Sequence, residues 1–265
     1  MKGCKLIKVL FFGDIVGKIG RDCFFKILPN LKKQHSPDLI ILNAENSANG
    51  RGITSKIYRS YLNAGVHCMT SGNHIFDNKE IVNNLDIFGS LVRPMNYPEG
   101  TPGNIVFKTT IKGTSIAVVN LLGQVFMPPI DNPFNRFERM LKEELADAKI
   151  IIADFHAEAT SEKKAFALNF SNRLSAVLGT HTHVQTNDAD IIDNRTAFIT
   201  DVGMVGSKNS ILGMAPESII YRFVSNMPAR IAPPESDSAV LVNYVSMEID
   251  LTGQAKSIKA YSITD

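Results

Sequence analysis

Residues 6–14 read LIKVLFFGD, a mostly apolar run that ends in a glycine and an aspartate. A nearly continuous run of this kind, without clean alternation of polar and apolar residues, is typical of a strand that is covered on both faces. Six further runs of strand length follow it, at 39–43, 67–71, 116–122, 150–155, 176–179 and 197–200. Helical patterns lie between them, so the sequence predicts an α/β fold with parallel strands.

Two of the helical patterns begin with a recognisable cap. Thr54 is expected to cap one helix, and Asn132 another whose first residue is a proline. An apolar stripe with helical spacing runs from Phe24 to Leu31, although Pro29 is expected to kink that helix.

The last part of the chain changes character. Residues 203–214 contain three glycines and little strand pattern, so they form either plain turns or a lid over a site. After them, 239–249 and 255–263 are two strand-like runs separated by a short polar loop, which predicts a β-hairpin. Because we find no internal repeat and no linker, we expect one domain over residues 1–265.

Composition excludes several classes of protein. The 265 residues are 44% hydrophobic and 20% charged, which is ordinary for a globular protein, and the net charge of +2 gives no basis for a nucleic-acid or membrane-surface binder. No apolar run approaches the ~18 residues of a membrane span, and no secretory signal is seen. The three cysteines, Cys4, Cys23 and Cys68, form no CxxC pair, so we expect neither disulfides nor a thiolate zinc site, and a cytoplasmic protein.

Side chains that can bind a metal or move a proton follow six of the predicted strands. They are Asp14, Glu45, Asn46, Asn73, His74, His156, His181, His183 and Asp201. Four of the six histidines are in this set, whereas His35 and His67 lie outside it and are interpreted as structural. Because ligands of α/β proteins bind beyond the carboxyl ends of the strands, we expect the whole set at one edge.

The residue types of this set indicate a hard or borderline metal. Carboxylate, amide and imidazole groups without a thiolate suit Mn, Fe or Zn. Two such ions can share a bridging carboxylate and a bridging hydroxide that attacks phosphorus in line. Taken singly, Asp14 is better explained as an N-cap or turn residue and His156 as a satisfied semi-buried histidine, so the convergence of the set carries the hypothesis.

Longer motifs bring a family resemblance. Gly13-Asp14, the GNH at 72–74 and the GTHTH at 179–183 resemble the calcineurin-like metallophosphoesterases. Five further stretches resemble the YmdB-type bacterial phosphodiesterases: NAEN (43–46), LVRP (91–94), PEGTPG (98–103), DFHAEATSEK (154–163) and TDVGM (200–204). The resemblance implies a four-layer sandwich in which two central mixed sheets are flanked by helices.

The chain departs from the broad superfamily at two positions. The first motif, usually Asp-x-His, has Ile15 and Val16 after Asp14, and the usual bridging aspartate is replaced by Glu45. Both changes are typical of the YmdB-type branch. They leave one imidazole fewer on the first metal and a longer bridging carboxylate.

The resemblance implies a role for each residue of the set. The expected ligands are Asp14 and His183 on the first metal, Glu45 as the bridge, Asn73, His156 and His181 on the second, and Asn46 on the first metal or the phosphate. His74 is the expected general acid, because imidazole titrates near neutral pH; the alternative is that it orients a ligand. Asp201 either orients a ligand histidine or caps the next loop. Arg21, Arg51 and Arg93 are candidates for contacting a phosphate, although surface pairing is the commoner fate of an arginine.

The activity implied is the hydrolysis of 2′,3′-cyclic or 3′,5′-cyclic nucleoside monophosphates by attack of a metal-bridging hydroxide. Two Fe or Mn ions are expected, with Zn as the alternative. The resemblance also implies a homo-oligomer, as is common in the family. One rival interpretation is a phosphomonoesterase that uses the same metals. Another is a regulatory nucleotide- or RNA-binding protein with little turnover, against which the complete ligand set argues.

Overall fold

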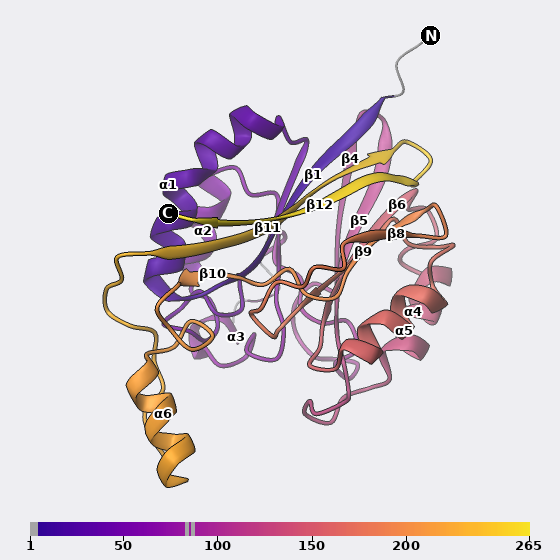
Figure 1. Ribbon diagram of the computed structural model, residues 1–265. Helices are drawn as coiled ribbons and strands as arrows, with labels where there is room; N and C mark the ends of the chain where they lie inside the picture. The colour runs from indigo at the N-terminus through magenta and orange to yellow at the C-terminus, as the bar shows by residue number, and fades with distance from the viewer. Residues whose placement is uncertain (1–4, 83–84, 86–87) are drawn as a thin grey trace.

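The computed structural model describes residues 5–82, 85 and 88–265. Four layers succeed one another across it (Figure 1): helices α1 (Gly17–His35) and α2 (Ser55–Asn63), two six-stranded sheets, and helices α4 (Pro133–Lys142) and α5 (Thr160–Asn169). This arrangement confirms the sandwich that the resemblance implied. No helix in the described part of the chain is long and apolar enough to cross a membrane.

The first sheet is mixed and has the strand order β12-β11-β10-β1-β2-β3. Its strands are β1 (Leu6–Ile15), β2 (Leu39–Asn43), β3 (Cys68–Thr70), β10 (Met204–Ser207), β11 (Val240–Asp250) and β12 (Ala255–Thr264). Strands β1, β2 and β3 run parallel, β10 is parallel to β1, and β11 is antiparallel to both β1 and β10. The predicted C-terminal hairpin is confirmed as β11 and β12.

The second sheet has the strand order β4-β5-β6-β7-β9-β8. Its strands are β4 (Val106–Ile111), β5 (Thr114–Leu122), β6 (Ile150–His156), β7 (Ala176–Thr180), β8 (Asp190–Ile192) and β9 (Thr196–Ile199). The four inner strands β5, β6, β7 and β9 are parallel, and the edge strands β4 and β8 are antiparallel to their neighbours. The carboxyl ends of the parallel strands of this sheet therefore point in one direction.

Strand β1 shows why its sequence is apolar on both faces. Val9 and Phe11 are buried between the two sheets, in one cluster with residues of β5 and β6. Leu10 and Phe12 point to the other side and are buried against helix α1, in a cluster with Phe24. Each fully buried side chain of this size contributes about 1.5–3 kcal/mol relative to an exposed one.

All seven predicted strands exist, and their ends differ from those in the structure by at most two residues. Thr54 caps α2 by accepting a hydrogen bond from the backbone N–H of Ile57, and Asn132 caps α4 in the same way. Helix α1 continues through Pro29 to His35, so the proline does not end it. Strands β4 and β8 and helices α3 (Lys79–Val82), α5 and α6 (Pro216–Ser225) were not among the predicted elements.

The prediction for residues 203–214 is wrong in its first part. Met204–Ser207 form strand β10, which is buried between β1 and β11 and therefore belongs to neither a set of turns nor a lid. A strand that is buried on both faces and only four residues long shows no alternation, which explains why the sequence pattern missed it. In the rest of the segment, Ile211, Leu212 and Met214 line a cavity.

Candidate metal centre

The carboxyl ends of parallel strands from both sheets bring the predicted polar residues together. Asp14 lies near the end of β1, and His156 is the last residue of β6. The turns after β2, β3 and β7 supply the others: Glu45, Asn46, Asn73, His74, His181 and His183. These side chains gather as expected. They lie where the carboxyl ends of strands from the two sheets come together.

A compact group of ligand-type atoms surrounds Nε2 of His156. Glu45 Oε1 lies 3.0 Å from it, Asn73 Oδ1 3.1 Å and His181 Nδ1 3.0 Å. Two ligand atoms on adjacent corners of an octahedron with bonds of about 2.1 Å lie about 3.0 Å apart. The spacing of this group therefore fits side chains that share one cation, and Glu45, His156 and His181 form a candidate metal-binding group.

Hydrogen bonds outside this group fix the tautomer of His156. Its Nδ1 lies 2.8 Å from Thr180 Oγ1, and that hydroxyl donates to Asp154 Oδ1 at 2.6 Å. Because the Thr180 hydroxyl proton is used by Asp154, Thr180 accepts the Nδ1–H of His156. In neutral His156 the lone pair of Nε2 is thereby directed into the site, as is usual for a metal-binding histidine.

The other two histidines are oriented in the same way. His181 Nε2 lies 3.2 Å from Glu158 Oε2, and His183 Nδ1 lies 2.9 Å from the carbonyl oxygen of Leu212. A carboxylate and a carbonyl can only accept, so these outer nitrogens carry the hydrogens. The inner nitrogens, Nδ1 of His181 and Nε2 of His183, are left with a lone pair that faces the site.

Asp14 offers a further buried carboxylate close to His183. Its Oδ1 is 3.8 Å from His183 Nε2, and its Oδ2 accepts the backbone N–H of His181 at 3.3 Å. Asn46 donates its amide to the carbonyl of Gly50, which fixes its Oδ1 as the free atom. Within the described residues, both Asp14 Oδ1 and Asn46 Oδ1 are buried and accept no hydrogen bond. Buried oxygens rarely remain without a partner, and a cation is one kind of partner that would satisfy such an atom.

The backbone at Gly72 leaves room for this constellation. A Cβ atom at that position would lie 2.2 Å from Glu45 Oε2 and 2.5 Å from His156 Nε2. Any side chain there would displace Glu45 and His156. The glycine of the GNH motif is thus required by the space that the site occupies.

The pKa values of the residues in this group depend on one another's charges. Burial alone would raise the pKa of Glu45, but the adjacent His156 lowers the pKa to about 2. Burial alone would lower the pKa of His156, but Glu45 and then Asp14 raise it to about 9. Burial, followed by the charge of His156, lowers the pKa of His181 to about 3, and burial raises the pKa of Asp14. Without a metal, a proton on His156 therefore neutralises Glu45.

The turn that carries two of the histidines is held by a buried ion pair. His181 and His183 have φ angles of 106° and 65°, values that residues other than glycine rarely adopt. Lys163 Nζ donates to the carbonyl of Thr180 and to Asp201 Oδ2, both at 2.8 Å, and neither charged side chain is exposed. Asp201 also accepts the backbone N–H of Thr182 at 3.0 Å. The pair thus fixes the backbone on both sides of His181.

The alternatives left open for Asp201 are decided by these contacts. The carboxylate accepts backbone N–H groups from Thr182 and Gly203, so it caps the loop. No hydrogen bond joins it to a histidine side chain among the described residues. His35 and His67, interpreted as structural, bond instead to the hydroxyl of Tyr244 and the backbone N–H of Ile40.

His74 lies beside the metal-binding group and is held by hydrogen bonds at its backbone and its ring. Its backbone N–H donates to Glu45 Oε2 at 2.9 Å, and its Nδ1 lies 2.8 Å from Asp77 Oδ2. The side chain is 25% exposed, and the residue lines the same cavity as the metal group. Because Asp77 holds Nδ1–H, the Nε2 atom is the one available to a bound ligand.

Of the three candidate arginines, Arg51 lines that cavity and lies 3.8 Å from Asp77. Arg21 donates to the carbonyl of Ser47 instead. Arg93 is buried and donates to backbone carbonyls of residues 94, 101 and 102. The structure thus gives the last two arginines structural contacts.

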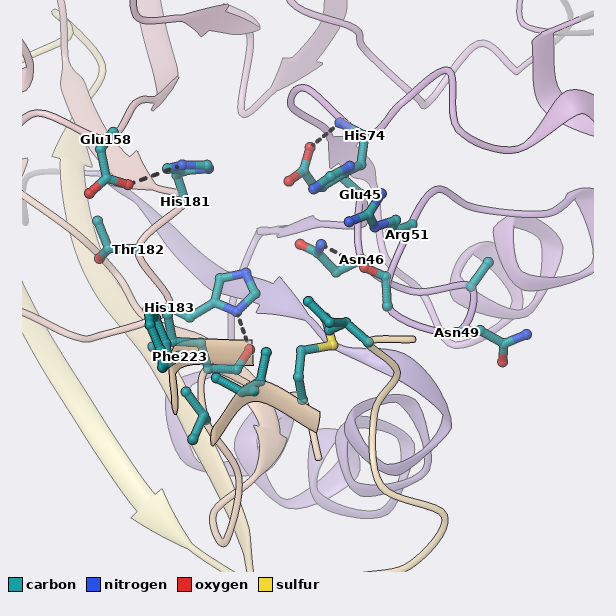
Figure 2. Close-up of a pocket in the computed structure, with 17 residues that line it drawn as sticks. Glu45, Asn46, Asn49, Arg51, His74, Glu158, His181, Thr182, His183 and Phe223 are labelled. Carbon is teal, nitrogen blue, oxygen red and sulfur yellow. Dashed lines mark hydrogen bonds and ion pairs between the residues drawn. The ribbon is translucent and has the colours of Figure 1, made fainter. Parts of the chain in front are cut away.

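The cavity in front of the metal group has a volume of about 650 Å³ (Figure 2). Glu45, His74, Glu158, His181 and His183 line it from the polar side. Apolar side chains of residues 211–231 line it from another side. This volume lies within the range of ordinary small-molecule pockets.

Sequence reasoning missed the residues that support the histidines, namely Asp77, Asp154, Glu158, Lys163 and Thr180. A signal existed for Lys163, because in α5 it precedes the buried Phe166 and Ala167 by three and four residues. A charged residue on the buried stripe of a helix requires a partner. The others give no such signal, since an acidic or hydroxyl residue in a turn is ordinary.

Comparisons with known proteins agree with this geometry. The family model described as YmdB-like protein matches residues 10–261. A 2′,3′-cyclic-nucleotide 2′-phosphodiesterase of Bacillus subtilis is 44% identical over 259 residues, which are 98% of each chain. A crystal structure of a novel phosphatase of Mycoplasma pneumoniae has a TM-score of 0.92 at 33% identity and covers 98% of this chain and 94% of the other. A crystal structure of a hypothetical protein of Thermus thermophilus has a TM-score of 0.91 at 37% identity, with 98% and 100% covered. The chain therefore belongs to the YmdB-like protein family.

Proposed function

We propose that this protein is a metal-dependent phosphodiesterase that hydrolyses cyclic nucleotides. One observation carries the proposal: Glu45, Asn73 and His181 converge on His156 Nε2 at 3.0–3.1 Å in front of an open cavity. The likeness to the 2′,3′-cyclic-nucleotide 2′-phosphodiesterase of Bacillus subtilis supports this class of substrate.

The donor atoms suit two cations. Asp14, Asn46 and His183 would hold the first, Glu45 would lie between the two, and the second would bind Asn73, His156 and His181. Oxygen and nitrogen donors with octahedral spacing favour Mn or Fe, and Zn is the alternative. When bound, two such ions would lower the pKa of a water molecule and neutralise charge on the phosphoryl oxygens.

Side chains of the protein would bind the phosphate and supply the proton that the leaving oxygen needs. His74 faces the cavity with Nε2 while Asp77 holds its Nδ1–H at 2.8 Å. A protonated His74 would donate from Nε2 to the oxygen that leaves phosphorus, so that the leaving group departs as an alcohol. Arg51 lines the same cavity and would attract the anionic phosphate.

The test uses metal-stripped protein that is reloaded with Mn²⁺ and assayed with 2′,3′-cyclic AMP. Asn73→Ala and His156→Ala should abolish turnover while the circular dichroism spectrum stays that of the wild type. His35→Ala, a histidine outside the site, is the matched control and should keep its activity. Full activity in either ligand variant after reloading would show that the catalytic site has been misplaced.

A phosphomonoesterase is the second candidate, favoured by the likeness to a solved structure described as a phosphatase. The two functions differ in the protonation and charge of the substrate rather than in the metals. The ratio of kcat/KM for 2′,3′-cyclic AMP to that for 3′-AMP separates them. A large advantage of the monoester would replace the proposed activity with this one.

A further inference from the structure

The cavity has an apolar side that the proposed chemistry does not use. Six of the described residues form it, namely Ile211, Leu212, Met214, Ile219, Phe223 and Ile231. None of these side chains carries a nitrogen or oxygen atom, so none can bind a phosphate or ligate a hard cation. In Figure 2 Phe223 lies beside His183 and away from Glu45 and His74.

This apolar wall is not part of a hydrophobic core. The structure describes all ten residues of helix α6, and none of them is buried. The helix projects from the layers of the sandwich (Figure 1). Phe223 is 84% exposed although it lines the cavity. A large aromatic side chain that gains so little from folding is typical of a surface that contacts a ligand.

We propose that the wall formed by residues 211–231 binds the nucleobase of the substrate, with Phe223 as the stacking platform. The inference rests on the proposed function and specifies where each end of a cyclic nucleotide lies. The phosphate would lie at the metal group, and the base would lie against the apolar wall of the same cavity. The volume of about 650 Å³ falls within the range that accommodates ligands of this kind.

The composition of the wall sets the specificity. With no hydrogen-bonding side chain, the wall contacts the face of a base and does not read its edge. All four bases are therefore accepted. Purines, which offer a larger apolar face, give a lower KM than pyrimidines.

The experiment compares two cyclic diesters, one with a base and one without. In 2′,3′-cyclic AMP and in glycerol 1,2-cyclic phosphate, water adds to phosphorus and one ring P–O bond breaks, which leaves a monoester and a free hydroxyl. Phe223→Ala should lower kcat/KM for 2′,3′-cyclic AMP about 5-fold or more, in line with the loss of one base–aromatic stack. It should leave kcat/KM for glycerol 1,2-cyclic phosphate unchanged. Val224→Ala, the next residue of α6 and 82% exposed, does not line the cavity and should change neither.

Two results would overturn the base site while the proposed function stands. In both, the wild type hydrolyses both substrates. In the first, Phe223→Ala lowers kcat/KM equally for both substrates, and in the second it lowers kcat/KM for neither. A third result, that Val224→Ala reproduces the loss, would assign α6 another role and equally reject the stacking platform. If the wild type hydrolyses neither diester, the proposed function itself fails.

Discussion

Replacing Lys163 by methionine tests whether the buried ion pair behind the histidine turn acts as the structure indicates. The lysine ammonium and the Asp201 carboxylate are both fully buried and 2.8 Å apart. Lys163→Met keeps the length of the side chain and removes its charge. The carboxylate of Asp201 then stays in the interior, and its remaining partners among the described residues are the N–H groups of Thr182 and Gly203.

The expected cost is large for a single substitution. Breaking a buried pair by removing one partner destabilises a protein by about 3–5 kcal/mol, because an uncompensated charge remains inside. In the double variant Lys163→Met with Asp201→Asn no charge remains buried, so the loss should be smaller by at least ~1 kcal/mol. The backbone of Thr180 also loses its anchor, and the unusual φ angles of His181 and His183 are then no longer enforced.

The assay is urea unfolding of the Mn²⁺-loaded protein, followed by measurement of bound Mn²⁺ in the folded variant. Lys164→Met is the matched control, since its exposed ammonium lies 4.4 Å from the ring of Phe198 and should cost at most ~1 kcal/mol. The reasoning would be refuted if Lys163→Met cost no more than Lys164→Met. It would equally fail if the double variant were as unstable as the sum of its single changes.

Three further predictions concern the metal-binding group and His74. Gly72→Ala should lower the metal content of the purified protein, because its Cβ would lie 2.2 Å from Glu45 Oε2. Gly89→Ala, whose Cβ would have no atom of the described residues within 4 Å, should not, and equal metal contents would contradict the packing described. His74→Ala should lower kcat about 10²–10⁴-fold for 2′,3′-cyclic AMP but far less for bis(p-nitrophenyl) phosphate, whose leaving group needs no proton; equal losses would argue against a general acid. The affinity of metal-free protein for Mn²⁺ should rise about tenfold per pH unit and level off above pH 9, because the proton on His156, whose pKa is about 9, must leave before the metal binds; isothermal titration at several pH values would detect a flat profile, which would contradict this.

The sequence predicted the parts of the fold that depend on short-range pattern. The apolar runs of β1 and β6 are long enough to identify, and the threonine and asparagine caps of α2 and α4 act locally. The polar residues at strand ends could be placed together because parallel strands leave little freedom in where their carboxyl ends point. That one prediction brought Asp14, Glu45 and His156 to the same edge.

What the sequence could not predict depends on contacts between distant segments. Strand β10 is recognisable only once β1 and β11 enclose it, and Asp201 shows its role only when Lys163 of α5 lies opposite. The single-domain prediction for residues 1–265 stays a prediction, as do the roles of the individual ligands. The apolar wall was invisible in the sequence, because isoleucine and phenylalanine in a helix ordinarily indicate a buried face.

The central claim is that side chains from both sheets hold two neighbouring cations. Anomalous diffraction from crystals of the Mn²⁺-loaded protein measures this directly. The account predicts two anomalous peaks about 3.5–4 Å apart, one beside His156 and His181 and the other beside Asp14 and His183, with Glu45 between them. A single peak, or peaks away from these five side chains, would contradict it.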